Sequence, residues 1–439
     1  MKFILGIYNY IIYQIKKTSS FDGRIIVITC LSIYFLMIYS STLFTNYYDF
    51  WNLLGVPARP YPFGDLWVIT SGIECHRLGY NIYKENPCNP WPYFAEFNYP
   101  RIWLSLTNLG LSSSHTILLG TSIIIIFLVM VLISIKNLNF AEGLIYSLVL
   151  CSPAVMLGIE RANNDLIIFI ILSISLLLIN SSQIIWRLTS YLLLLFAAIL
   201  KIYPIFALSL ILRESRRKFF IITTFLTGVF VSYLIAEFNN FKQVYLATPQ
   251  VNYWSYGSKI LLSSLFNHIK AIIKTLGINK QSIYRVLPDS FSQKIILLLA
   301  IVIFVSCLIY ILYKLNYQIN ENININFIDA FRLGASIYIG SFLITNSWAY
   351  RLIFLIFTLP QILSWMKKES CLRFLSMFSI LAIILTVWIK IKAVAGLLFY
   401  VDQIMNWVIL FYFIYTLILT LPQWFKKQLF IIDNKASQL

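Results

Sequence analysis

The chain has 439 residues, of which 59% are hydrophobic and only 12% are charged. This composition excludes an ordinary soluble domain and indicates a polytopic membrane protein. The apolar runs are continuous, which predicts transmembrane helices rather than barrel strands. The net charge of +17 does not indicate nucleic-acid binding, because the basic residues fall mainly in short loops between the apolar runs.

At roughly 20 residues for each span, a chain of this length can hold about 10–13 transmembrane helices. We expect them to form a single all-α integral-membrane domain over residues 1–439. The first apolar run, residues 25–44, is too long for the hydrophobic part of a signal peptide and predicts a first transmembrane helix.

Short basic loops set the expected orientation. The densest, residues 213–218, contains four Lys and Arg side chains. Placing such loops in the cytoplasm puts both termini inside and two long segments outside, residues 46–101 and 237–294. Within the second segment, residues 258–276 have apolar side chains at helical spacing, which fits an amphipathic helix at the membrane interface. An additional span there would reverse the orientation of every later helix.

The first outside loop contains Asp65, a lone carboxylate in an apolar and aromatic neighbourhood. A carboxylate in such surroundings is a candidate to accept a proton in a reaction. Two other interpretations stay open. Asp65 could cap the helix that follows it, and Asp49, near the end of the first span, could be the reactive acid instead.

Two cysteines, Cys75 and Cys88, share the same outside loop. In an oxidising compartment they predict a disulfide that closes a short loop and contributes roughly 3 kcal/mol. The alternative is a pair of free thiols.

Three polar islands interrupt the later apolar runs, at residues 160–165, 200–204 and 346–351. Ionisable groups at membrane depth cost several kcal/mol each, so those found there are functional candidates. The expected orientation places all three islands at the outer face.

Each island contains a cation at the outer end of a span: Arg161, Lys201 and Arg351. Three such cations favour a shared site for an anionic lipid phosphate. The alternative is three separate side chains that reach to the lipid headgroups. Asp165 could neutralise Arg161, because the two are four residues apart.

Several cofactor signatures are missing from the sequence. There is no phosphate-binding P-loop, no dinucleotide glycine fingerprint, no His/Cys cluster and no acidic pair in an outside segment. We therefore expect neither a cofactor nor a metal. An enzyme at the outer face lacks cytoplasmic nucleotides and needs a lipid-borne donor.

Together these motifs resemble those of integral-membrane glycosyltransferases of the C-type fold. The resemblance is strongest to the bacterial family of polyprenyl-phosphate-mannose-dependent mannosyltransferases. The residues that carry it span most of the chain: Gly64 and Asp65, residues 79–83, Asn98 to Pro100, residues 160–165, residues 200–204, and Tyr350 with Arg351.

The resemblance implies a reaction and its participants. A polyprenyl-phosphate sugar, a hexose such as mannose, would be the donor, and a glycan or glycolipid the acceptor. Asp65 would be the catalytic base of an inverting single displacement, and Arg161, Lys201 and Arg351 would hold the donor phosphate. Further substrate contacts would come from Asn98, Tyr99, Arg101, Asn164, Asp165, Tyr203 and Tyr350.

The same resemblance implies a place for the reaction, the extracytoplasmic face of the bacterial inner membrane, among membrane lipids. Trp67, Trp91, Tyr93 and Trp254 could stack on sugar rings, although aromatic belts at the interface explain them equally well. Two rival functions stay open. A transporter or flippase of lipid-linked sugars would use the same cations without Asp65, and a polysaccharide polymerase or ligase would transfer whole glycans.

Overall fold

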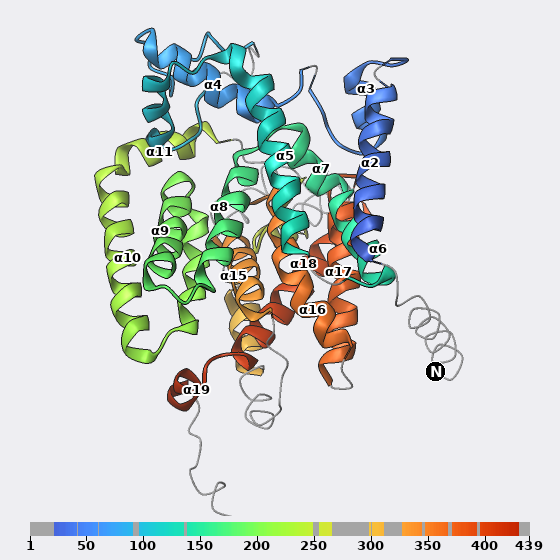
Figure 1. Cartoon of the computed structure of the whole chain (residues 1–439), viewed down its shortest axis with the longest axis vertical. Helices are drawn as coiled ribbons and strands as arrows, with labels where there is room; N and C mark the ends of the chain where they lie inside the picture. Colours follow the sequence, from blue (N-terminus) through green and yellow to red (C-terminus); the bar gives the residue numbers. More distant parts are fainter. Residues whose placement is uncertain are drawn as a thin grey trace, which may run out of the picture.

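The computed structural model describes residues 22–429, apart from residues 42, 60, 91–95, 136–137, 249–253, 266–297, 300, 311–326, 345–346, 368–370 and 393–395. The described chain is mostly helical, as the sequence predicts (Figure 1).

Long apolar helices run along the length of the molecule, and six among the described residues are long and apolar enough to cross a membrane. They are α2 (Gly23–Ser41), α5 (Thr116–Ser134) with the preceding turn η2 (Ser113–His115), α10 (Arg216–Ala236), the consecutive η4 (Ala349–Thr358) and α16 (Leu359–Met366), α17 (Cys371–Lys392) and α18 (Leu397–Leu419). A seventh candidate, bent by 53°, consists of α6 (Phe140–Leu150) and α7 (Pro153–Glu160). These helices fit a multi-pass membrane protein.

Within the part of the chain that the structure describes, the number of full-length candidates is smaller than the 10–13 spans expected for the whole sequence. Four further apolar helices in the described part are shorter: α8 (Asn164–Ile179), α9 (Ile184–Leu200), η3 (Tyr203–Arg213) and the helix Ile301–Tyr310. The first three begin or end at the polar islands, so each stops before it reaches the length of a full span.

Local capping explains where α7 and α8 begin. Ser152 caps α7 by accepting a hydrogen bond from the Val155 amide, and Pro153 occupies the first helical position, where its missing N–H costs nothing. The chain then turns sharply through Ala162, which has a left-handed φ of 42°. Asn163 caps α8. Two helices therefore meet at a tight polar turn.

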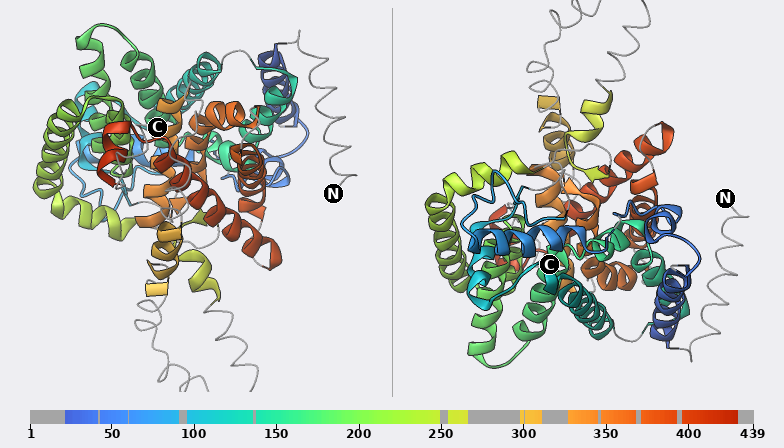
Figure 2. Two further views of the ribbon diagram at one scale, coloured as in Figure 1. Left: turned by 90° about the horizontal axis from the view of Figure 1, so that it is seen from below. Right: turned by 90° about the horizontal axis from the view of Figure 1, so that it is seen from above.

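The helices of the first long loop lie at one end of the molecule. Both α3 (Tyr47–Leu53) and α4 (Gly64–Arg77) are at the top in Figure 1, and α11 (Phe238–Ala247) lies near α4, on the side away from α3. Seen from above, α4 crosses the end of the bundle (Figure 2). The last helix, α19 (Gln423–Leu429), lies at the other end.

The second long loop departs from a purely helical design. Its described part contains β1 (Ser255–Tyr256), which pairs antiparallel with β2 (Ser347–Trp348). The chain is helical from residue 260 to 265, and the remainder of the expected interfacial helix lies outside the described residues.

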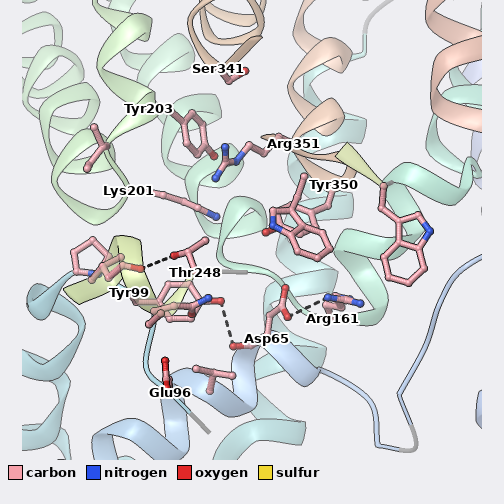
Figure 3. Close-up of a pocket in the computed structure, with 18 of the residues that line it drawn as sticks. Asp65, Glu96, Tyr99, Arg161, Lys201, Tyr203, Thr248, Ser341, Tyr350 and Arg351 are labelled. Carbon is pink, nitrogen blue, oxygen red and sulfur yellow. Dashed lines mark hydrogen bonds and ion pairs between the residues drawn. The ribbon is translucent and has the colours of Figure 1, made fainter. Parts of the chain in front are cut away.

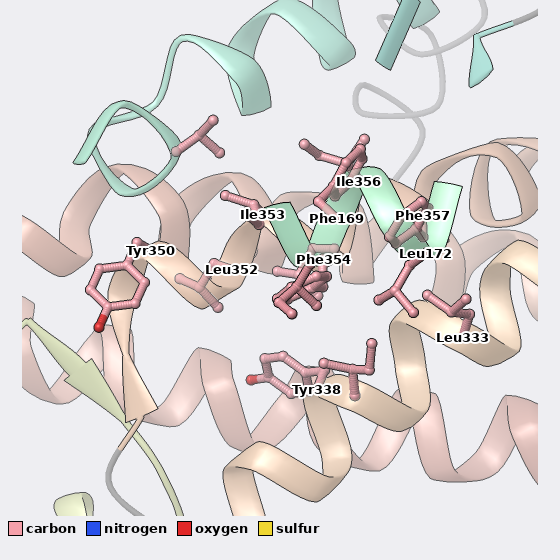
Figure 4. Close-up of a cluster of buried hydrophobic side chains, with 14 of the residues drawn as sticks. Phe169, Leu172, Leu333, Tyr338, Tyr350, Leu352, Ile353, Phe354, Ile356 and Phe357 are labelled. Atoms are coloured by element: carbon pink, nitrogen blue, oxygen red, sulfur yellow. The ribbon is translucent and has the colours of Figure 1, made fainter. Parts of the chain in front are cut away.

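Aromatic packing holds the centre of the bundle together (Figure 4). The ring of Phe169 in α8 stacks on Phe357 in η4, with centroids 4.2 Å apart, and Tyr338 of α15 (Ile328–Ile344) stacks on Tyr256 of β1. Between helices in lipid, such close packing supplies much of the attraction. Because η4 begins with Ala349, Tyr350 and Arg351, this core fixes the position of the third polar island.

Candidate functional site

A cavity of about 1010 Å³ opens at the end of the bundle where α4 and α11 lie. Its walls come from α3, α4, the loop before η1 (Arg101–Leu109), α11, and the starts of η3 and η4. All three cations predicted from the polar islands line it: Arg161, Lys201 and Arg351. Asp65 lines it too, and Figure 3 shows the four side chains directed toward one another.

The first turn of α4 is attached to the turn between α7 and α8. The backbone amide of Phe63 donates to the carbonyl of Glu160 at 2.8 Å. The amides of Asp65 and Leu66 both donate to the carbonyl of Arg161, at 3.2 and 3.3 Å. These bonds satisfy amides that the helix itself leaves without a partner, and they fix Asp65 beside the first polar island.

The Asp65 carboxylate faces the cavity and is 14% exposed. One oxygen accepts a hydrogen bond from Asn163 Nδ2 at 2.6 Å, and the other lies 3.6 Å from Arg161 Nη1. The carboxylate does not cap its own helix, because the cap position is Phe63 and no side-chain cap bond is present. The rival acid, Asp49, is exposed on α3 and is not part of the cavity wall.

A second carboxylate, Asp165, is fully buried behind the cavity wall. It forms an ion pair with Lys201, lies 3.8 Å from Arg351 Nε, and accepts a 2.8 Å hydrogen bond from the Tyr203 hydroxyl. Lys201 also donates to Asn164 Oδ1 at 2.6 Å. Two of the predicted phosphate cations therefore share one carboxylate.

The ion pair between Arg161 and Asp165 that their spacing suggests is not present. The rule for residues four apart holds only within one helix, and here α7 ends at Glu160 and α8 begins at Asn164. Arg161 instead faces Asp65, with its guanidinium 5.8 Å from the Trp348 ring centroid. Its side chain is 8% exposed, and Nε has no hydrogen-bond partner.

Lys201 lies in the turn between α9 and η3, beyond the end of α9. Burial lowers the pKa of its ammonium to about 8, although the Asp165 carboxylate opposes that shift. The side chain is thus charged at neutral pH. Its nitrogen is 5.5 Å from the Tyr350 ring centroid, a distance suited to a cation–π contact.

The structure brings some of the predicted substrate residues to the cavity and leaves others behind it. Asn98, Tyr99, Tyr203 and Tyr350 line the wall. Asn164 and Asp165 lie behind Lys201 and position it. Arg101 is exposed and is not among the lining residues.

Of the four aromatic residues predicted to stack on sugar rings, the structure describes two, of which one lines the cavity and the other does not. Trp254 lines the cavity, with a left-handed φ of 64°, and its carbonyl accepts from the amide of Ala349 at 2.7 Å. Trp67 donates its indole N–H to the Pro62 carbonyl and does not line the cavity. Trp91 and Tyr93 lie outside the described residues.

Some residues of the site were not predicted from the sequence. Arg59 is a further cation in the cavity wall, and Trp348 is an aromatic wall residue stacked on Tyr350. Asn163 binds Asp65 directly. Asn163 and Trp348 lie within the polar islands, so their position in the sequence could have identified them as site residues. Nothing in the sequence around Arg59 distinguishes it.

Cys75 and Cys88 form a disulfide, with Cα atoms 5.7 Å apart. The bond joins the last turn of α4 to the following loop, and Asn86 of that loop also donates to Ser71 of α4 at 3.0 Å. The loop leads on to Asn98 and Tyr99 in the cavity wall.

Among the described residues, no group of three or more His, Cys, Asp or Glu is placed to hold a metal ion. Comparisons of the chain with family models, with curated proteins and with solved structures gave no match. The function proposed below therefore rests on the cavity and on the sequence motifs.

Proposed function

We propose that the chain is a membrane glycosyltransferase of the C-type fold. It moves a hexose such as mannose from a polyprenyl-phosphate donor to a glycan or glycolipid acceptor, at the extracytoplasmic face of the bacterial inner membrane. The observation that carries the proposal is that one cavity is lined by the Asp65 carboxylate and by three largely buried cations, Arg161, Lys201 and Arg351.

The balance of charge around the cavity suits a departing phosphate. Lys201 and Arg351 share the one negative charge of Asp165, so that group retains a net positive charge. In a displacement at the anomeric carbon, the donor phosphate gains negative charge as the bond to the sugar breaks. Fixed cations stabilise that charge more in a water-poor cavity than they would at a free surface.

In this proposal Asp65 acts on the acceptor. It would take the proton from the acceptor hydroxyl as that oxygen attacks the anomeric carbon, while the bond from that carbon to the phosphate oxygen breaks. A single displacement of this kind inverts the configuration. The sugar passes to the acceptor, polyprenyl phosphate leaves, and the proton stays on Asp65 until it is lost to water.

The lining of the cavity has an apolar side and a polar side. Phe241, Val244 and Ala247 of α11 recur every three residues, so they present one apolar face. Lys84 and Glu96 belong to the segment after α4 and line the polar side. A donor with a hydrocarbon chain and an acceptor rich in hydroxyls fit these two sides.

The test uses purified protein in lipid nanodiscs. It is incubated with polyprenyl-phosphate mannose, or another polyprenyl-phosphate hexose, and with a glycolipid extract of bacterial membranes. Mass spectrometry should find an acceptor that has gained one hexose and a released polyprenyl phosphate. Donor flipping in vesicles without transfer would support the transporter instead. Transfer only of whole glycans from a diphosphate lipid would support the polymerase or ligase.

A further inference from the structure

The side-chain amide of Asn163 makes two different hydrogen bonds, one through its oxygen and one through its nitrogen. It caps α8, its Oδ1 accepting a 2.9 Å hydrogen bond from the backbone amide of Asp165. Only 1% of its surface is exposed. The left-handed turn at Ala162 just before it sets the direction in which the side chain leaves the backbone.

The cap fixes the orientation of the amide, and that orientation serves Asp65. Because Oδ1 must face the helix amide, Nδ2 must point the other way, where it donates to Asp65 Oδ2 at 2.6 Å. A flipped amide would place its oxygen against the carboxylate and its N–H₂ against the amide of Asp165. Both contacts would be repulsive, so the two neighbours select one orientation.

This hydrogen bond affects how Asp65 meets Arg161. The terminal torsion of an aspartate is soft, and an arginine beside it commonly takes both oxygens in a two-pronged pair. Here the nearest approach of the two groups is 3.6 Å, longer than a hydrogen bond. Asn163 holds one oxygen of Asp65, and Nε of Arg161 has no hydrogen-bond partner.

The same amide also contacts the cationic side of the cavity. Asn163 Oδ1 lies 3.4 Å from Lys201 Nζ. One buried side chain thus joins the candidate base, on α4, to a candidate phosphate cation in the turn between α9 and η3. Figure 3 shows Asp65 and Lys201 on adjoining parts of the wall.

We propose that Asn163 is a positioning residue for the reaction. It keeps Asp65 out of a closed pair with Arg161, so that the carboxylate is free to take the acceptor proton and the guanidinium is free to bind substrate. This inference rests on the proposed function. It adds a specific role for a residue that would otherwise be only a helix cap.

The main variant is Asn163→Ser. Serine is as good a helix cap as asparagine, but its short hydroxyl cannot reach Asp65. The kcat for transfer should fall at least about tenfold, since small misplacements of catalytic groups cost up to about a hundredfold. The KM for the donor should change by less than about threefold, and the melting temperature should stay close to that of the wild type. A second variant, Asn163→Asp, keeps the size and the cap but removes the donor, and its kcat should fall at least as far.

Asn139→Ser is the matched control. Asn139 caps α6 in the same way, accepting from the Glu142 amide at 3.0 Å, and it does not line the cavity. Its kcat should equal that of the wild type. If Asn163→Ser keeps wild-type kcat, or if its loss is explained by a lower folded fraction, the inference is overturned.

A double-mutant cycle measured by thermal melting tests this inference separately from the proposed function. The variants Asp65→Ala and Asn163→Ser, and their combination, should shift the melting temperature non-additively, because the two side chains are bonded. Additive shifts would overturn the inference whatever reaction is catalysed. An inactive wild type with every polyprenyl-phosphate sugar would count against the proposed function, and the cycle would still decide whether Asn163 holds Asp65.

Discussion

Asp165 is the residue on which two of the three predicted phosphate cations depend. Its side chain is 1% exposed, and it lies between Lys201 and Arg351. Each of those cations has lost most of its water, so the carboxylate is what makes their burial tolerable. Asp165, which was expected to bind substrate, instead stabilises Lys201 and Arg351, and these two residues line the cavity.

The first prediction concerns this support. Asp165→Asn removes the negative charge and leaves two buried cations next to each other. The free energy of unfolding should fall by roughly 3–5 kcal/mol, as when one partner of a buried pair is lost. Thermal melting in nanodiscs measures the change. Arg161→Ala is the comparison and should cost less, because Asp65 keeps its bond from Asn163 and its access to water. The reverse order would contradict the pairing described above.

The second prediction concerns the base. Asp65→Asn keeps the shape but removes the basicity, so transfer should fall at least about a hundredfold, within the 10²–10⁴ typical of positioned acid–base groups. Asp49→Asn is the control and should keep full activity, since Asp49 is exposed and outside the cavity wall. Rates are compared at equal amounts of folded protein. Loss of activity in the control and not in Asp65→Asn would transfer the role to Asp49.

The third prediction is a pH dependence. The Lys201 ammonium is charged below its pKa of about 8 and neutral above it. Donor binding, measured as kcat/KM for the polyprenyl-phosphate sugar, should therefore decline as the pH rises through about 8. Lys201→Arg keeps its charge across this range, so its decline should move to higher pH. A decline at the same pH in both proteins would mean that another group is responsible.

The sequence could predict which residues gather at the site but not how they pair. Arg161, Lys201 and Arg351 stand out because polar residues within apolar runs are costly, and all three do line one cavity. The predicted ion pair between Arg161 and Asp165 was wrong because it required an unbroken helix through residues 161–165. Arg59 gave no signal because it lies in a loop, where an arginine is common.

At the level of elements, α2 and α6 approach each other unusually closely. A Cβ on Gly143 would lie 2.4 Å from the carbonyl oxygen of Gly23, a backbone atom that cannot rotate away. Small residues allow such contact between helices in a membrane. The position of α6 then fixes α7 and the polar turn that follows it.

The fourth prediction tests this contact. Gly143→Ala should force α2 and α6 apart and lower the free energy of unfolding by about 1–3 kcal/mol, the usual cost of overpacking. Gly228→Ala on α10 is the matched control, because no atom lies within 4 Å of its added methyl group. It should be neutral or slightly stabilising, since alanine favours a helix over glycine. An equal loss of unfolding free energy in both variants would show that close packing at Gly143 is not the cause.

Sequence patterns predicted the long helices better than their interruptions. The span α5 follows directly from a continuous apolar run. The bend between α6 and α7 depends on a serine cap and a proline, and the turn after α7 depends on the backbone of Ala162. Each of these breaks depends on one or two residues within an apolar stretch, so the hydropathy averaged over about 20 residues does not detect it.

At the scale of the whole molecule, the first long loop and the basic segment at residues 216–218 lie at opposite ends of the long axis (Figure 1). The first long loop, which the sequence places outside, folds into α3 and α4 at one end. The basic residues 216–218 begin α10 at the far end, because α10 leads up to α11 beside the cavity.

The fifth prediction follows from this separation. Single cysteines placed after Arg217 and in α3 should react with a membrane-impermeant thiol reagent from opposite sides of the membrane. Intact cells should label only the site in α3, and permeabilised cells both. Labelling of both sites in intact cells would contradict the expected orientation.

With the orientation expected from the basic loops, the bond between Cys75 and Cys88 would make the maturation of this protein depend on an oxidant outside the membrane. The insertion of the helices does not need that oxidant, but the attachment of α4 to the segment that follows it does. A cell with no thiol oxidation in its outer compartment would make chains of the correct mass whose cavity wall is not tied to α4. If the proposed function is correct, preparations from such a host, or preparations kept in strong reductant, would contain fully inserted protein with low transferase activity.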